Sequence, residues 1–163
     1  MANIATTQPP AKLNLFLELL GKRDDGFHEI DTVMTPIDWC DQLRVERREQ
    51  REITLTTDWI PSAEIMASRL GVHVDDALLQ IPTGHGNLVY RALDRFLDRF
   101  KIASGFHCEL NKCIPAGAGM GGASSDAASA LRCAAMLHDI PPDHDDLFEI
   151  AAEIGSDVPF FLG

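Results

Sequence analysis

The chain has 163 residues, of which 45% are hydrophobic and 24% charged, the composition of an ordinary globular domain. Its net charge of −11 argues against a nucleic-acid partner, and the absence of a long apolar run argues against a transmembrane helix or a membrane partner. Segment 1–10 has neither the basic nor the apolar region of a secretory signal, so we expect a cytoplasmic protein.

Alternating leucines open the first half of the chain, at every second position from 13 to 19. This period of two predicts a strand, and the polar turn 21–26 predicts that it forms a long hairpin with the strand after it. Two shorter alternating segments follow around a charged turn. The strands predicted for this half cover 12–20, 28–38, 43–47 and 52–56.

Helix signals dominate the second half. Pro61, expected at the first helical position, and Gly71 bound a short helix, and 82–86 predicts a loop. Asn87 then caps an amphipathic helix whose apolar residues recur every four positions. An alanine-rich helix from Ser124 to about 138 is expected to lie close to a sheet, and 143–154 predicts a third long helix.

Segment 106–112 alternates apolar and polar residues, which predicts a strand with one solvated face, as antiparallel sheets allow. The pattern as a whole predicts an α+β domain, with an antiparallel-rich mixed sheet and helices packed on it. The last segment, 158–163, is apolar and is interpreted as the start of another strand. We therefore expect the chain to be the N-terminal part of a longer protein.

Cysteines stand at positions 40, 108, 113 and 133. They form no Cys-x-x-Cys pair, and no nearby histidine completes a zinc pattern. We predict four reduced and mostly buried thiols.

A glycine-rich segment between the strand at 106–112 and the helix after it predicts a phosphate-binding loop. Glycines let backbone N–H groups approach a ligand closely, and a helix N-terminus adds free N–H groups and a positive dipole end. The candidate nucleotide-binding residues here are Pro115, Ala116, Gly117, Ala118, Gly119, Met120, Gly121, Gly122, Ala123, Ser124 and Ser125. This arrangement would let an acidic chain hold a triphosphate with few basic side chains.

The same glycines fit G-x-G-x-x-G, the spacing of dinucleotide-binding folds. The context differs from those folds, because the preceding strand alternates and no acidic residue ends a strand about 20 positions later. The Walker A pattern is absent. A plain glycine turn with a serine cap is the structural alternative.

The segment from Pro115 to Ala128 resembles the P-x-G-x-G-L-G-[GS]-S-S-x-A-A motif of the GHMP kinases, which include galactokinase, homoserine kinase and mevalonate kinase. Segments 10–30 and 155–161 resemble two further motifs of the family. The resemblance covers about residues 8–57 and 86–163, and Met120, Ala123 and Phe27 depart from its commoner residues. It implies the ribosomal protein S5 domain 2-like fold, with 1–163 as the N-terminal ATP-binding domain and the C-terminal domain absent.

The N-terminal motif is most similar to the branch of the family that phosphorylates the 2-hydroxyl of a cytidyl diphosphate sugar alcohol, a step of non-mevalonate isoprenoid synthesis. The resemblance implies ATP and Mg²⁺ as cofactors. It implies Asp157 as the group that accepts the hydroxyl proton and Lys12 as its cationic partner. Asn14 lies two residues from Lys12, on the same strand face, and is expected to bind the polyol.

Phe27 and His28 follow the polar turn and are expected to stack on and hydrogen-bond the cytosine. Asn87 and Lys112 are expected near the adenine, and Ser125 is the candidate Mg²⁺ ligand. Ordinary structural roles remain open for these residues: a turn for Asp157, a solvated strand for Lys12 and Lys112, a core pair in the hairpin and a cap at Asn87. Another GHMP kinase of the homoserine or mevalonate type, or an inactive nucleotide-binding module, remains the functional alternative.

Overall fold

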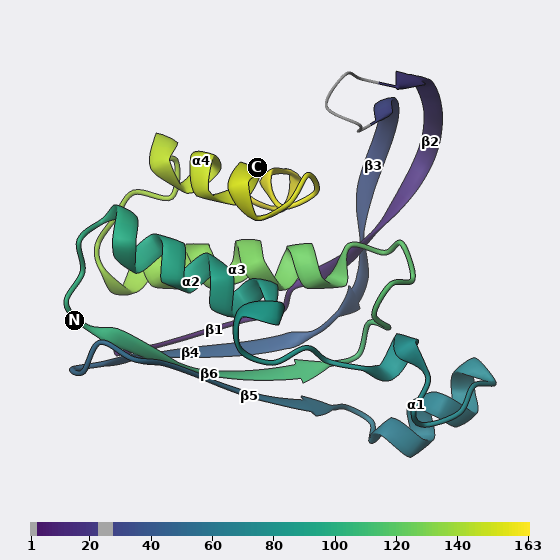
Figure 1. Cartoon of the computed structure of the whole chain (residues 1–163), viewed down its shortest axis with the longest axis horizontal. Helices are drawn as coiled ribbons and strands as arrows, with labels where there is room; N and C mark the ends of the chain where they lie inside the picture. Colours follow the sequence, from purple (N-terminus) through teal and green to yellow (C-terminus); the bar gives the residue numbers. More distant parts are fainter. Residues whose placement is uncertain (1–2, 23–27) are drawn as a thin grey trace.

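A computed structural model describes residues 3–22 and 28–163 as a four-stranded sheet, a separate hairpin and helices (Figure 1). The strands are β1 (Ile4–Thr7), β2 (Pro10–Lys22), β3 (His28–Cys40), β4 (Gln42–Arg48), β5 (Ile53–Trp59) and β6 (Gly105–Lys112). The α-helices are α1 (Ala63–Leu70), α2 (Leu88–Arg99), α3 (Gly122–Leu137) and α4 (Asp145–Ile154). Short 3₁₀ helices are η1 (Ala77–Leu79), η2 (Gly84–Gly86) and η3 (Pro159–Phe161).

The main sheet has the strand order β1-β4-β6-β5. β4 is antiparallel to both β1 and β6, and only β5 runs parallel to its neighbour β6. Phe106, Cys108 and Leu110 of β6 are buried while the residues between them are half-buried, as the alternation predicts. The predicted antiparallel-rich mixed sheet of an α+β domain is confirmed.

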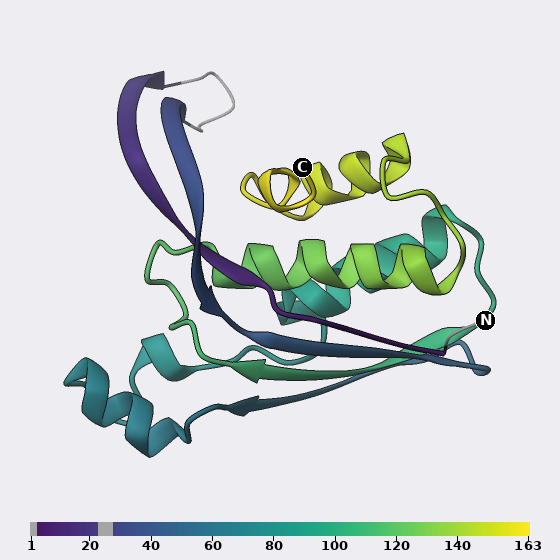
Figure 2. The same ribbon diagram turned by 180° about the vertical axis from the view of Figure 1, so that it is seen from behind.

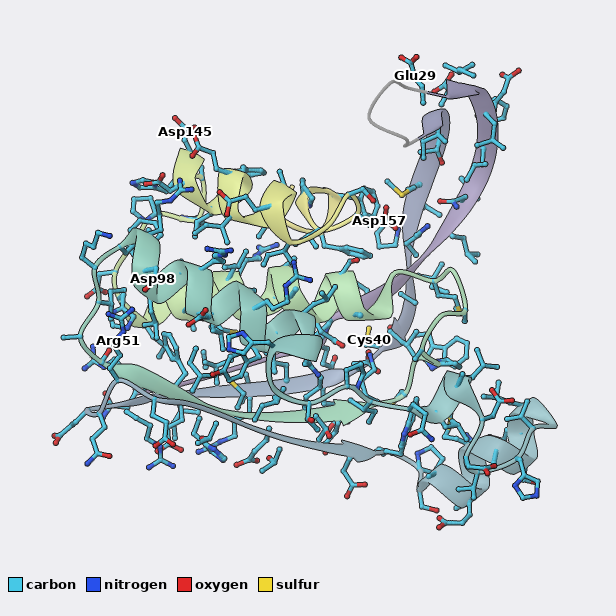
Figure 3. The ribbon with its side chains drawn as sticks, in the orientation of Figure 1. Glu29, Cys40, Arg51, Asp98, Asp145 and Asp157 are labelled. Atoms are coloured by element: carbon cyan, nitrogen blue, oxygen red, sulfur yellow. The ribbon has the colours of Figure 1, made fainter. Side chains whose placement is uncertain are left out.

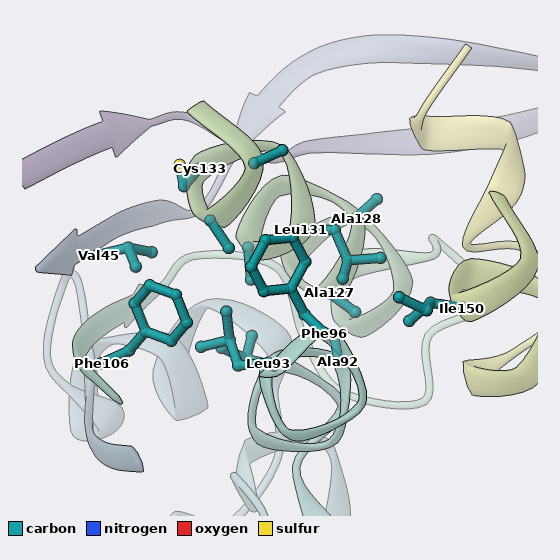
Figure 4. Packing of buried hydrophobic residues seen from close by; sticks show 14 of the residues in the cluster. Val45, Ala92, Leu93, Phe96, Phe106, Ala127, Ala128, Leu131, Cys133 and Ile150 are labelled. Carbon is teal, nitrogen blue, oxygen red and sulfur yellow. The ribbon is translucent and has the colours of Figure 1, made fainter. Parts of the chain in front are cut away.

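Helices cover one face of this sheet in two layers. α2 and α3 lie on the sheet, and α4 lies over them on the side away from it (Figures 1 and 2). Phe96 of α2, Phe106 of β6 and Leu131 of α3 meet at the centre of the core (Figure 4). The predicted close approach of the alanine-rich helix is confirmed, since Ala127 and Ala128 on its inner face are fully buried.

The hairpin β2–β3 does not join the main sheet. It rises past the N-terminal end of α3 and stands beside the C-terminal segment (Figure 1). The two strands pair antiparallel along their length, as the leucine alternation and polar turn predict. Their apolar side chains remain largely uncovered, and Leu15 and Leu19 are 67% and 64% exposed. The hairpin therefore carries an apolar surface beside the C-terminal segment.

Several boundaries differ from the prediction. α3 begins at Gly122 rather than Ser124, because Gly121 adopts a left-handed φ of 69° and serves as its N-cap. The interpretation of 158–163 as a strand is wrong. Pro159 fixes a helix-compatible φ, and Leu162 N–H donates to the Pro159 carbonyl at 3.1 Å, so a 3₁₀ turn forms. Pro61 precedes the N-cap Ser62 of α1 rather than occupying the first helical position.

Among the described residues, no helix is both long and apolar enough to cross a membrane. All four cysteines are free thiols, but only Cys108 and Cys133 are buried, whereas Cys40 and Cys113 are half-buried.

Candidate phosphoryl-transfer site

The glycine loop connects the end of β6 to α3 through a series of left-handed residues. Gly117, Gly119 and Gly121 have φ values of 66°, 72° and 69°, a region that other residues rarely adopt. No side chain caps α3, so the free N–H groups of its first turn face the loop. Ala123, which replaces a common glycine, lies inside the helix, where no left-handed backbone is needed.

A cavity of about 540 Å³ opens beside this loop, which is the size of a small-molecule site. The loop residues from Pro115 to Ser124 form one wall, and the loops around η1 and η2 form the other. The backbone joins the two walls, because Ala116 N–H donates to the Leu78 carbonyl at 2.8 Å. The residues beyond the loop that line the cavity are Trp59, Ala77, Gln80, Ile81, Pro82, Gly86, Asn87, Leu88, Leu110, Lys112 and Asp126.

Lys12 of β2 lies against the loop and is only 5% exposed. Its backbone N–H donates to the Met120 carbonyl at 2.8 Å. Its ammonium donates to Asn14 Oδ1 at 2.9 Å and lies 3.5 Å from Asp157 Oδ2. Asp157 projects from the C-terminal segment on the side that faces the hairpin (Figure 3). Asp157, far from Lys12 and Asn14 in the sequence, is thus brought to them beside the loop.

Gly121 of the loop lies against both Lys12 of β2 and Phe161 of η3. A Cβ at this position would lie 3.0 Å from Lys12 Cγ and 3.0 Å from Phe161 Cζ. By contrast, a Cβ on Gly117 or Gly119 would meet nothing within 4 Å, so these two glycines face open space. The loop therefore has one crowded end, against Lys12 and η3, and one open stretch over the cavity.

Lys112 lines the cavity, but its side chain is engaged below the loop. Its ammonium pairs with Asp41 and with Asp126 Oδ2, the latter at 2.7 Å. Burial opposes a charged lysine, yet the two carboxylates outweigh it and raise the pKa of Lys112. Burial also raises the pKa of Asp126, and Lys112 opposes that effect. Asn87 caps α2 by accepting from Val89 N–H at 2.9 Å.

Two buried oxygens near the start of α3 have no hydrogen-bond partner in the described part of the chain: Ser125 Oγ and Asp126 Oδ1. The Ser125 hydroxyl is an oxygen donor of the kind that Mg²⁺ accepts, so it fits the expected ion. Ser124 lines the cavity, whereas Ser125 lies beneath it, fully buried. The described residues contain no group of three or more His, Cys, Asp or Glu side chains able to hold a metal.

Two residues, Phe27 and His28, are expected to contact the cytosine. Phe27 and the side chain of His28 lie outside the described residues, so both assignments stay predictions. Two residues of the site were not predicted from the sequence. Asp41 follows β3 and is fully buried. Trp59 donates from Nε1 to the Leu79 carbonyl at 3.0 Å and supports the far wall of the cavity. Neither stands in a recognisable motif.

Residues 87–163 match the family model of the GHMP kinases N terminal domain. The chain is 52% identical over 165 residues to 4-diphosphocytidyl-2-C-methyl-D-erythritol kinase of Rhodopirellula baltica, a match that covers 97% of this chain and 50% of that protein. The protein of the same name from Brevibacillus brevis is 37% identical over 155 residues, with 95% and 47% covered. The chain thus spans about half the length of the curated relatives that it matches.

Solved structures give the same result. A crystal structure of 4-(cytidine 5'-diphospho)-2C-methyl-D-erythritol kinase is 34% identical, with a TM-score of 0.69, and the match covers 97% of this chain and 48% of that one. Homoserine kinase from Cytophaga hutchinsonii has a TM-score of 0.63 at 16% identity, over 94% of this chain and 41% of that one, which is a likeness of fold alone. Sequence and fold therefore agree that this chain belongs to the GHMP kinase family and contains its N-terminal domain.

Proposed function

We propose that the protein transfers the γ-phosphoryl group of ATP to the 2-hydroxyl of 4-diphosphocytidyl-2-C-methyl-D-erythritol, a step of non-mevalonate isoprenoid precursor synthesis in the cytoplasm. The observation that carries this proposal is the contact of Lys12 with both Asp157 and the glycine loop. Two relatives that bear this enzyme's name, at 52% and 37% identity, support the choice of substrate. Because the chain spans about half of their length, the complete activity is part of the proposal.

Phosphoryl transfer needs positioning and charge stabilisation more than covalent help from the protein. In this proposal, Asp157 accepts the proton of the attacking hydroxyl. Lys12 orients that carboxylate from 3.5 Å and places a positive charge beside the reacting oxygens. Asn14, hydrogen-bonded to Lys12 at 2.9 Å, binds a hydroxyl of the polyol. All three act at the crowded end of the loop.

The open stretch of the loop holds the phosphates of ATP through backbone N–H groups around Gly117 and Gly119. The base of ATP enters the cavity between the loop and the segment that ends at Asn87 and Leu88. Mg²⁺ bound with ATP would neutralise phosphate charge. We assign Ser125 Oγ as the protein ligand that would hold it, because this oxygen has no hydrogen-bond partner in the described part of the chain. Few basic side chains are required, which suits a net charge of −11.

A comparison of three acceptor substrates tests the proposal. The complete protein is incubated with Mg²⁺ and ATP labelled at the γ-position, and with the cytidyl substrate, homoserine or mevalonate. We expect transfer to the cytidyl substrate only. Phe27→Ala is expected to raise KM for that substrate by about five- to 150-fold, since a stacked base contributes about 1–3 kcal/mol, and to leave the Kd of ATP nearly unchanged. Preference for homoserine or mevalonate, or equal losses for both ligands, contradicts the assignment.

A further inference from the structure

Three charged side chains, those of Asp41, Lys112 and Asp126, meet beneath the glycine loop and form the Lys112 cluster. They come from the β3–β4 junction, the end of β6 and the N-terminal part of α3. All three are at least 95% buried, and the lysine ammonium contacts a carboxylate oxygen of each acid. The cluster therefore links three separate elements at the base of the candidate nucleotide site.

Asp41 fixes the entry of the loop. Its second oxygen, Oδ1, accepts from Ile114 N–H at 2.8 Å and also from Cys113 N–H. These are the last two residues before the loop begins at Pro115. Hydrogen bonds from two successive N–H groups to one buried carboxylate oxygen hold that strand end in one orientation.

Asp126 fixes the exit of the loop through the same lysine. It lies near the start of α3 and accepts from the Lys112 ammonium at 2.7 Å. Gly122 makes this approach possible, because a Cβ there would lie 3.3 Å from Lys112 Nζ and 2.9 Å from Ile114 Cγ2. The entry and the exit of the loop are thus tied to one ammonium group.

The charges of the Lys112 cluster argue against simple anion attraction. Two carboxylates surround one ammonium, next to a cavity where a triphosphate is proposed to bind. Stability does not account for the cluster either, because replacing a buried ion triad by well-packed hydrophobic residues of similar volume is often neutral or stabilising. What the geometry does provide is a fixed distance between the two ends of the loop.

We propose that the Lys112 cluster sets the shape of the phosphate-binding loop, so that Asp41, Lys112 and Asp126 are positioning residues for ATP. This inference rests on the proposed nucleotide site. Lys112 then acts on ATP through the backbone of residues 115–122 rather than by giving its charge to a phosphate. It also explains why a lysine that lines the cavity directs its ammonium toward two acids.

The test compares a broken cluster with a neutral one in the complete protein. Lys112→Met leaves two buried carboxylates without their shared cation, and we expect a lower urea midpoint and at least a tenfold higher Kd for Mg·ATP. The triple variant Asp41→Asn, Lys112→Met, Asp126→Asn removes all three charges with little change in volume. We expect its urea midpoint to lie above that of Lys112→Met, because no buried charge is left unpaired, and its binding of ATP to stay tenfold weaker. Lys101→Met, at an exposed lysine outside the cluster, is expected to change neither quantity.

Hydrogen exchange gives a second measurement on the triple variant, at a temperature well below its unfolding. The amides of Cys113, Ile114 and Ala116, which donate hydrogen bonds at the entry of the loop, are expected to exchange at least tenfold faster than in the wild type, while those of α2 exchange at the same rate. A stable triple variant whose Kd for ATP lies within twofold of the wild type overturns this inference and leaves the proposed function standing. A wild type that binds no ATP overturns both.

Discussion

Adding a single methyl group at Gly121 probes the contact between the loop and Lys12. Gly121→Ala forces alanine into a left-handed backbone with φ of 69°, at a cost of about 1–2 kcal/mol. The new Cβ also lies 3.0 Å from side-chain atoms of Lys12 and Phe161, which must shift by a few tenths of an ångström. Overpacking of this kind costs about 1–3 kcal/mol, so a total loss of about 2–5 kcal/mol is expected.

Gly119→Ala is the matched control, because its φ of 72° carries the same strain while its Cβ meets nothing within 4 Å. Any gain from restricting the unfolded chain is common to both variants and cancels in their difference. Urea unfolding of the ligand-free protein, followed by circular dichroism, should therefore show Gly121→Ala to be less stable than Gly119→Ala by about 1–3 kcal/mol.

The two variants should rank differently when ATP is the probe. Gly119→Ala adds a methyl group to the open stretch that is proposed to hold phosphates. We therefore expect it to lose more binding free energy for ATP than unfolding free energy. Gly121→Ala should instead lower kcat, because it displaces Lys12. Equal losses of stability in the two variants would refute the described packing of Lys12 and Phe161 against the loop.

Three further predictions concern the fold that supports the site. Asn87→Ala removes the cap of α2 and should lower the unfolding free energy by about 1 kcal/mol, and an unchanged urea midpoint would count against the cap. Burial, with Arg47 nearby, lowers the pKa of His138, so the unfolded state binds the proton more readily and stability should fall as the pH drops below about 6.5. His138→Gln should not lose stability over that pH range. Equal pH profiles of the unfolding free energy in this variant and the wild type would contradict the prediction. Burial raises the pKa of Cys108 to about 12 and of Cys133 to about 11, so mass spectrometry should find alkylation at Cys40 and Cys113 first. Early alkylation of Cys108 would show that the core opens readily.

Local patterns predicted most of the fold, because its elements carry strong local signals. The alternation in β6, the cap at Asn87 and the period of α2 each specify an element without help from the rest of the chain. The start of α3 was misplaced because the left-handed glycine that caps it offers no side chain to recognise. The final 3₁₀ turn was missed because a short apolar run does not distinguish a strand from a buried helical turn.

The candidate site was predictable where it coincides with a family motif. The family resemblance predicted that Lys12 and Asp157 act together, and in the structure Lys12 Nζ lies 3.5 Å from Asp157 Oδ2. Long-range contacts could not be predicted from the sequence, because Asp41 pairs with Lys112 across 71 positions and no spacing rule links the two residues. The direction of the Lys112 side chain likewise depends on two acids from other elements.

The central claim is that Asp157, beside Lys12 and the glycine loop, serves phosphoryl transfer. Its most direct test is single-turnover transfer from ATP to the cytidyl substrate by the complete protein and its Asp157→Asn variant, with ATP binding measured in parallel. A general base typically contributes about 10²–10⁴ in rate, so Asp157→Asn should slow transfer by that factor and leave the Kd of ATP nearly unchanged. A transfer rate within a few fold of the wild type would contradict the account.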